Sequence, residues 1–340
     1  MNTHTADDAI RLAIVSNSFT PYRLNVHVRL VDEIENLILR SLSTHGDSQG
    51  RWADLPVPER IGPVQVGPVR STMNRRDFKT LALDWKIGGE VIRQIQAWPA
   101  DAVLCQGYYD LARLRLLRWC YRHGVTCFLT GDSNIKGDKP RGIAKHVKPR
   151  FVTWCVSCVD GVMPCGTMGQ RFFQQYGASA DRTHLYPLEP HYPTFENVRP
   201  DLERQIVDRF GLSPWRRRLV FSARMTDVKR PDLLLAAFTE LAQDHPNWDL
   251  VMLGSGPLQE SLSVSLPEEL QSRVLWAGYI GDSREIAALY RHCDVLVLPS
   301  DYEPWAVVLP EAAAAGLAIV ASDCVGAAAE VVRPGINGFL

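Results

Sequence analysis

The chain has 340 residues, of which 46% are hydrophobic and 22% are charged. This composition excludes a disordered, collagen-like or coiled-coil protein, and the length suits two domains of about 150 residues each. The net charge is −1, but residues 1–199 contain 25 basic and 19 acidic residues, whereas residues 200–340 contain 12 and 19. The asymmetry fits either two domains with different partners or chance.

The cysteines and the first residues of the chain indicate a cellular compartment. Most of the eight cysteines lie in apolar runs, where they are expected to be small buried side chains. Cys155, Cys158 and Cys165 lack the second ligand pair that a structural zinc site needs. The beginning, MNTHTADDAIR, is polar, and no apolar run reaches the ~18 residues of a membrane span. These features predict a reduced cytoplasmic protein without disulfides.

Apolar runs alternate with amphipathic patterns along the first half of the chain. This alternation is typical of a parallel sheet with crossover helices, and residues 46–70 are expected to form a loop. The predicted strands are 10–16, 37–42, 102–105, 126–130 and 159–165, and the predicted helices are 26–37, 81–96 and 111–123.

The pattern breaks over residues 187–217, where PLEPHYPTFENVRP holds four prolines. We therefore predict a first domain at 1–196, a linker at 197–217 and a second domain at 218–340, both doubly wound α/β domains that face each other across a cleft. Ligands of such sheets bind beyond the carboxyl ends of the strands. The second series has predicted strands at 219–222, 250–253, 274–276, 295–298 and 319–321, and helices at 232–241, 283–292 and around 310–315.

Two cations and two glycines follow strands of this second series. Arg224 and Lys229 come just before a helix, where together they could neutralise a diphosphate; the alternative is a solvated charged loop. Gly254 and Gly256 end the next strand and would admit the close approach of a ligand. This pair alone is a weak signal, because the third glycine of a dinucleotide fingerprint is missing.

Two carboxylates flank a predicted helix start. Glu303 precedes a proline and is expected in an extended loop. Since proline is tolerated only in the first helical turn, Pro310 indicates that the helix begins no earlier than about Ala306. Amides of residues 306–309 would suit a phosphate, and Glu311 could accept hydrogen bonds from sugar hydroxyls. The alternatives are a surface position for Glu303 and compensation of the helix dipole by Glu311.

Arg-x4-Lys, Gly-x-Gly and Glu-x7-Glu in this order resemble the retaining glycosyltransferases of family GT4, which have the GT-B fold. The tail from Ala318 to Gly338 is also similar, so the resemblance is specific over residues 218–340 and diffuse before them. It implies an acceptor-side Rossmann-like domain followed by a donor-binding one. Because the family usually continues with further helices, the donor-binding domain is expected to be incomplete at Leu340, with apolar surface exposed.

The resemblance also implies roles for the motif residues. Arg224 and Lys229 would bind the diphosphate of a nucleoside-diphosphate sugar, and Glu303 would hold hydroxyls of the donor sugar. Cations and helix amides, rather than a metal ion, would assist the leaving group, and no cofactor is expected besides the donor substrate. The lack of an Asp-x-Asp motif for a divalent ion is consistent with this. The remaining donor-binding residues would be Gly254, Gly256, Tyr279, Ile280, Trp305, Ala306, Val307 and Glu311, the last at the ribose.

Three positions depart from the family pattern. Many members have a histidine after the strand that ends here in residues 128–134, and Asp132 is assigned as a catalytic residue in its place. The alternative for Asp132 is an Asx turn over residues 131–133. Many members have two glycines in the first loop, where this chain has Pro21-Tyr-Arg, and a glycine where it has Ala306.

A basic stretch spans residues 136–150, after a helix in which arginines stand beside leucines. One interpretation is peripheral contact with an anionic membrane, for which a lipid-linked acceptor would be the reason. The other is a solvated surface with leucines facing the core. Nucleic acid is not expected as a partner, because no recognition module accompanies the charge.

These observations predict a retaining, metal-independent glycosyltransferase in the cytoplasm or at the inner membrane face. It would move a sugar from a nucleoside-diphosphate sugar to a hydroxyl of a glycan or lipid-linked acceptor. The alternative is a non-catalytic relative that binds nucleotide sugars or scaffolds a partner glycosyltransferase. An epimerase of the same architecture is a third interpretation.

Overall fold

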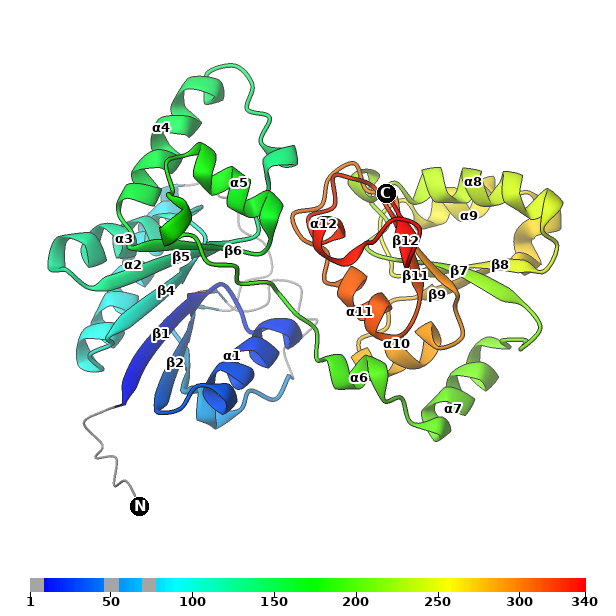
Figure 1. The fold of residues 1–340 in the computed structure, drawn as a ribbon, viewed down its shortest axis with the longest axis horizontal. Coiled ribbons are helices and arrows are strands. Elements are labelled where there is room, and N and C mark those ends of the chain that lie inside the picture. The colour runs from blue at the N-terminus through cyan, green and yellow to red at the C-terminus, as the bar shows by residue number, and fades with distance from the viewer. Residues whose placement is uncertain (1–8, 46–54, 69–77) are drawn as a thin grey trace. The chain divides into compact units, whose positions relative to one another are not determined.

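The computed structural model describes residues 9–45, 55–68 and 78–340. The chain divides into two compact units, with the division between Glu189 and Pro190. Each unit is built on one six-stranded parallel sheet with helices on both faces, as Figure 1 shows. The predicted α/β class with two doubly wound domains is therefore confirmed.

The first sheet has the strand order β3-β2-β1-β4-β5-β6. Along β1, Ala13 and Val15 pack into one apolar core and Ile14 into another, because successive side chains of a strand point to opposite faces. The strands are β1 (Ile10–Ser16), β2 (Leu37–Ser43), β3 (Pro63–Gln65), β4 (Ala102–Gln106), β5 (Thr126–Gly131) and β6 (Gly161–Pro164). The helices are α1 (Pro21–Glu33), α2 (Phe78–Ala97), α3 (Leu111–His123), α4 (Ala144–Ser157) and α5 (Thr167–Gln175).

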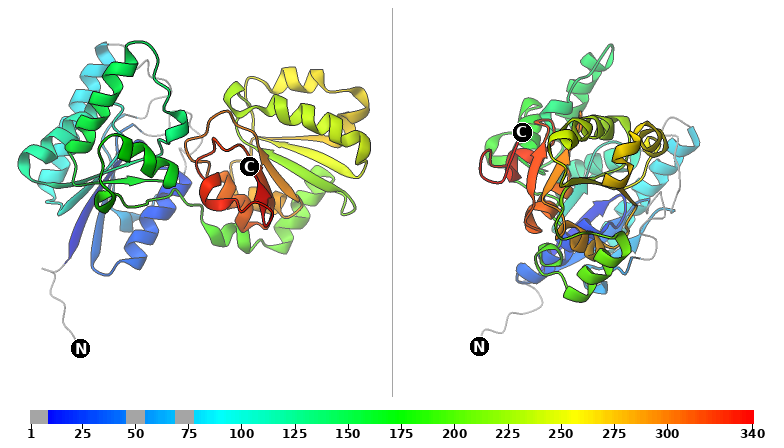
Figure 2. Two further views of the ribbon diagram at one scale, coloured as in Figure 1. Left: turned by 45° about the horizontal axis from the view of Figure 1, so that its top comes forward. Right: turned by 90° about the vertical axis from the view of Figure 1, so that its right-hand side faces the viewer.

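The second sheet repeats this topology in the order β12-β11-β10-β7-β8-β9. Helices α8 and α9 lie on one face of it, and α10 and α11 lie on the other (Figure 2). The strands are β7 (Arg217–Ser222), β8 (Trp248–Leu253), β9 (Val274–Gly278), β10 (Val295–Leu298), β11 (Ala318–Ala321) and β12 (Gly338–Phe339). The helices are α6 (Tyr192–Glu196), α7 (Pro200–Phe210), α8 (Pro231–Asp244), α9 (Gln259–Ser265), α10 (Ser283–Tyr290), α11 (Val308–Ala314) and α12 (Ala328–Val331).

Proline accounts for two differences from the predicted elements. Residues 197–217, treated above as a linker, contain α7, because Pro200 at its first turn starts the helix and Gly211 in the left-handed region ends it. The expected loop at 46–70 contains β3, which begins at Pro63 on the edge of the sheet, where a missing amide is tolerated. Residues 46–54 and 69–70 of that loop lie outside the described residues.

Six of the eight cysteines are buried, as their apolar surroundings in the sequence predict. Burial raises the pKa of Cys105 and Cys165 to about 12, which keeps these thiols protonated. In the described ranges no cluster of His, Cys, Asp or Glu is arranged to hold a metal ion. Among the same residues, no helix combines the length and hydropathy needed to cross a bilayer.

Candidate active site

The predicted donor residues gather beyond the carboxyl ends of β7, β8 and β10, which are close neighbours in the second sheet. The segment after β7 is tied to the segment after β10. The amide of Asp301 donates to the carbonyl of Val228 at 2.9 Å, and the Arg230 guanidinium donates to the Asp301 carboxylate at 3.2 Å. These contacts bring Lys229 and Glu303, which are 74 positions apart in the sequence, to one place.

Lys229 and Glu303 form a direct ion pair at this edge of the sheet. Their side chains are 19% and 15% exposed, so each charge is largely removed from water. Burial, together with the nearby charge of Arg224, lowers the pKa of Lys229 to about 8. A nearby anion stabilises a lysine whose pKa is lowered, because the added negative charge raises that pKa and favours the protonated form.

The backbone of Glu303 is fixed by the segment that follows β11. Its amide donates to the carbonyl of Cys324 at 3.4 Å, and its carbonyl accepts from the amide of Gly326 at 3.0 Å. A Cβ at Gly326 would lie 2.0 Å from the carbonyl oxygen of Pro304, so only glycine allows this approach. The Glu303 side chain is therefore presented on a rigid loop.

Gly254 and Gly256 have a packing role that the sequence did not show. A Cβ on Gly254 would lie 2.1 Å from the carbonyl oxygen of Ala223, and one on Gly256 would lie 2.3 Å from that of Met225. The two glycines thus let the loop that carries Arg224 lie directly against the end of β8. The amide of Met225 donates to the carbonyl of Ser255 at 3.1 Å, which holds this loop in place.

The helix start after Glu303 leaves amides available for a ligand. Helix α11 begins at Val308, and Leu309 donates its amide to the carbonyl of Ala306 at 3.2 Å. The amides of Ala306 and Val307 donate to no other residue in the described part of the chain. Ala306 has a φ of 81°, a value at which glycine is favoured, so the alanine here is strained.

Glu311 lies in the first turn of α11 and is half-buried. Burial raises its pKa to about 7, so it is ready to accept or to donate a hydrogen bond near neutral pH. Burial and, to a lesser degree, the charge of Glu311 raise the pKa of Tyr290, which is fully buried at the end of α10. This tyrosine was not predicted as a neighbour of the site, because nothing in its local sequence pattern separates it from an ordinary core aromatic.

The other predicted donor residues differ in what they can offer. Tyr279 is 46% exposed in the turn after β9, whereas Ile280 and Trp305 are each only 6% exposed. The last two side chains belong to the core, so only their backbone groups can reach a ligand. Gly278 has a φ of 68° and makes the turn that presents this segment.

Asp132 belongs to the first unit and is exposed directly after β5. It lies close enough to Cys165 to raise the pKa of that thiol. A larger polar cluster at the same edge of this sheet was not predicted. It consists of the Arg113 guanidinium and its acceptors Asp110, the Gln106 carbonyl, Asn17 Oδ1 at 2.7 Å and Thr44 Oγ1 at 3.2 Å.

The fold of the chain matches solved structures along nearly its whole length. Anabaena HepE in complex with UDP and glucose superposes with a TM-score of 0.70 at 17% identity, covering 97% of this chain and 85% of HepE. Sucrose-phosphate synthase from Thermosynechococcus elongatus superposes with a TM-score of 0.73 at 18% identity, with the same coverage. The chain therefore has the GT-B fold.

Sequence comparisons find similarity to glycosyltransferases over part of the chain. Residues 205–340 match the model of the family "Glycosyl transferases group 1", in agreement with the motifs of the second unit. D-inositol 3-phosphate glycosyltransferase from Nocardia farcinica is 29% identical over 301 residues, 82% of this chain and 63% of the relative. An uncharacterized glycosyltransferase from Methanocaldococcus jannaschii is 32% identical over 131 residues, 38% of this chain and 33% of the relative. The matched regions cover less than two thirds of the length of these two relatives.

Proposed function

We propose that the chain is a retaining glycosyltransferase that moves a sugar from a nucleoside-diphosphate sugar to a hydroxyl of a glycan or lipid-linked acceptor. The observation that carries this proposal is the ion pair of Lys229 and Glu303 beside the strained start of α11. A largely buried lysine with a pKa of about 8 is a ready partner for a diphosphate. The UDP and glucose in the complex of HepE support a donor of the same chemical class.

In the proposed reaction the acceptor hydroxyl oxygen bonds to the anomeric carbon of the donor sugar. The bond from that carbon to the diphosphate breaks with its electron pair on the phosphate oxygen, and the hydroxyl proton leaves with the diphosphate. Arg224, Lys229 and the amides of Ala306 and Val307 would stabilise the charge that develops on this oxygen, without a metal ion. Glu303 would orient the donor sugar through its hydroxyls.

The remaining roles are part of the same proposal. Glu311, with a pKa of about 7, would hydrogen bond the ribose, and the turn at Tyr279 would border the base. Asp132 would contribute a hydrogen bond from the first unit to a substrate hydroxyl. Gly254 and Gly256 would act by holding the loop of Arg224 in position.

Nucleotide binding tests the donor site directly. Thermal unfolding of the whole chain is followed with UDP, GDP, ADP and their sugar conjugates in the presence of EDTA. We expect one nucleotide to raise the melting temperature in a concentration-dependent way and Lys229→Ala to abolish the shift. Arg284→Ala, which removes an exposed cation of α10 paired with Asp282, is the matched control and should keep it.

Two results would decide against this function. If no nucleotide shifts the melting temperature, the donor-site assignment is wrong. If a nucleotide sugar binds but is neither transferred to a panel of acceptors nor hydrolysed, the alternative of a non-catalytic nucleotide-sugar binder replaces the transferase. Transfer that requires a divalent cation and stops in EDTA would refute the metal-independent step.

A lipid-linked acceptor would place the first unit near a membrane. Ile143 and Val147, at the start of α4, are 82% and 58% exposed, and Arg141 and Lys145 beside them are exposed as well. Apolar side chains flanked by cations suit an anionic bilayer surface. Sedimentation with phosphatidylglycerol vesicles would test this contact, with Ile143→Ser expected to weaken it and neutral vesicles as the control.

A further inference from the structure

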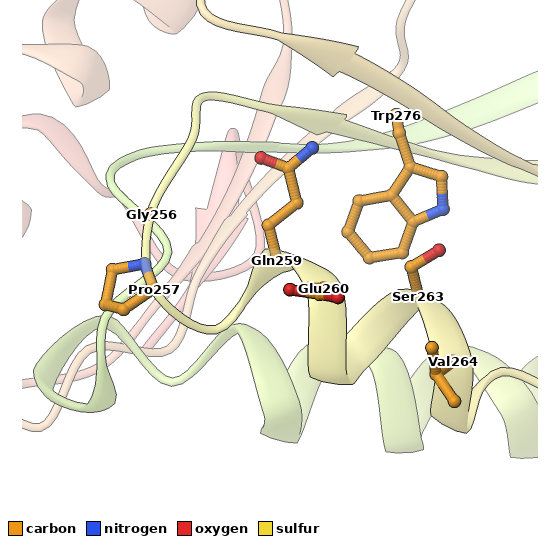
Figure 3. A pocket seen from close by; sticks show the side chains of 7 residues that line it. All are labelled: Gly256, Pro257, Gln259, Glu260, Ser263, Val264 and Trp276. Carbon is orange, nitrogen blue, oxygen red and sulfur yellow. The ribbon is translucent and has the colours of Figure 1, made fainter.

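A pocket of about 590 Å³ lies between α9 and β9, the strand at one edge of the second sheet. Its lining runs from Gly256 and Pro257 along α9 to Trp276 on β9, as Figure 3 shows. We call this feature the Trp276 pocket. The Lys229–Glu303 ion pair and α11 do not line it, and Gly256 is the one motif residue that does.

Trp276 supplies an aromatic surface that the described residues do not use. The side chain is half-buried, and its indole N–H makes no hydrogen bond within the described ranges. It also makes no stacking or cation–π contact with another described residue. A large aromatic side chain usually buries its ring and satisfies its polar group, whereas this ring offers a surface on which a ligand can stack.

Helix α9 faces the indole with polar side chains. Gln259 and Glu260 precede Ser263 by four and three residues, which places each of them next to Ser263 on the helix surface. In Figure 3 Gln259 and Ser263 extend from α9 toward Trp276. None of the three side chains forms a hydrogen bond or ion pair with another residue in the part of the chain that the structure describes.

The side chains that line the pocket indicate which kind of ligand it can bind. A pyranose ring has a C–H face that stacks on an aromatic ring and hydroxyls that both donate and accept hydrogen bonds. Gln259 and Ser263 can donate and accept, and Glu260 can accept. Glu260 is also the one charged residue of the lining, so the pocket repels phosphate groups. We propose that the Trp276 pocket binds a neutral sugar unit of an oligosaccharide or polysaccharide chain.

The volume of the pocket lies within the range of about 300–1,000 Å³ that is typical of small-molecule sites, so it has room for at least one sugar ring. Its role rests on the proposed function: the pocket would hold a glycan acceptor at a distance from the residues that transfer the sugar. It begins at Gly256, on the loop that also positions Arg224, so the two sites share one structural element.

The affinity for glycans is measured by isothermal titration calorimetry of the whole chain, in the presence of EDTA and without nucleotide. The probes are six-unit neutral glucose, galactose and mannose oligosaccharides. We expect at least one of them to bind, Trp276→Ala to weaken its affinity about tenfold and Trp276→Phe to retain most of it, because the ring supplies the stacking surface. Trp215→Ala, which removes a tryptophan that is 87% exposed elsewhere in this unit, should have no effect.

Three results would overturn the proposal: no oligosaccharide binds, Trp276→Ala binds as tightly as the unchanged chain, or Trp276→Ala abolishes the nucleotide-induced thermal shift while glycan binding stays the same. The last result would assign the pocket to the nucleotide. Lys229→Ala separates this proposal from the transferase function, since it should bind oligosaccharide normally. Oligosaccharide binding that depends on Trp276 would stand even if no sugar transfer were found.

Discussion

Each sheet has a cation beyond the carboxyl ends of its strands, and the two cations differ in their burial and in their partners. Arg113 in the first unit has a fully buried side chain, and four acceptors satisfy its guanidinium. Lys229 in the second unit keeps 19% of its side chain exposed, and its ion-pair partner Glu303 has a second proposed role in binding the donor. Burial lowers the pKa of Lys229 to about 8.

This difference separates a cation that joins segments of the fold from the cation that we propose to bind the donor diphosphate. The partners of Arg113 come from the loop after β1, the end of β2, the end of β4 and the N-cap of α3, so the guanidinium joins four segments of the fold. Because the Arg113 guanidinium already makes these hydrogen bonds, a ligand could add few further interactions to it. Lys229 would gain electrostatic energy from a bound diphosphate, because its charged form is poorly solvated in the unliganded protein.

The largest expected effect is the loss of stability in Arg113→Ala. Removing one partner of a buried ion pair leaves Asp110 and several acceptors unsatisfied, and typically costs about 3–5 kcal/mol. Chemical denaturation followed by circular dichroism measures the change. Arg118→Ala, at an exposed position of the same helix, should change the free energy of unfolding by less than about 0.5 kcal/mol. Equal stability of the two variants would contradict a structural role for Arg113.

The second prediction concerns the other cation. Lys229→Met should lower kcat/KM by about 100- to 1,000-fold, the range found when one group that stabilises developing charge is removed. The double variant Lys229→Met/Glu303→Gln should regain the stability that either single change costs, because both charges are then removed, but it should stay inactive. An active double variant would show that the ion pair serves only the fold.

The third prediction is a pH dependence. Because the pKa of Lys229 is lowered to about 8, the unliganded protein loses this charge above that pH, whereas a bound diphosphate favours it. Nucleoside diphosphate affinity should therefore fall between pH 8 and pH 10. The unfolded chain holds the proton up to about pH 10.5, so this group should make the protein more stable as the pH rises through the same window. Lys229→Arg, which stays charged, should flatten both profiles.

The smallest expected effect is at Ala306, whose φ of 81° is unfavourable for an alanine. Ala306→Gly should stabilise the chain by about 0.5–1 kcal/mol, since relief of the strain exceeds the entropy that glycine adds to the unfolded state. Thermal unfolding measures this gain. Ala312→Gly, inside α11, is the control and should destabilise instead. A loss of stability in Ala306→Gly would show that the positive φ is not strained.

Much of the second unit could be predicted from the sequence because its signals are local. Strand β10 was predicted with its observed bounds, since a short apolar run bounded by polar residues leaves few other structures. The motif residues Arg224, Lys229 and Glu303 stand just after strands, and the parallel order of the sheet brings such positions to one edge. The sequence by itself therefore determined the class of fold and the position of these three residues beyond the carboxyl ends of the strands.

Only the tertiary structure decided how these residues interact. The pairing of Lys229 with Glu303, the saturation of Arg113 and the contacts that require Gly254 depend on segments far apart in the chain. Burial, which sets the pKa of Glu311, is likewise a property of the packed protein. The physical reason is that backbone patterns arise from neighbours in sequence, whereas desolvation and close packing arise from neighbours in space.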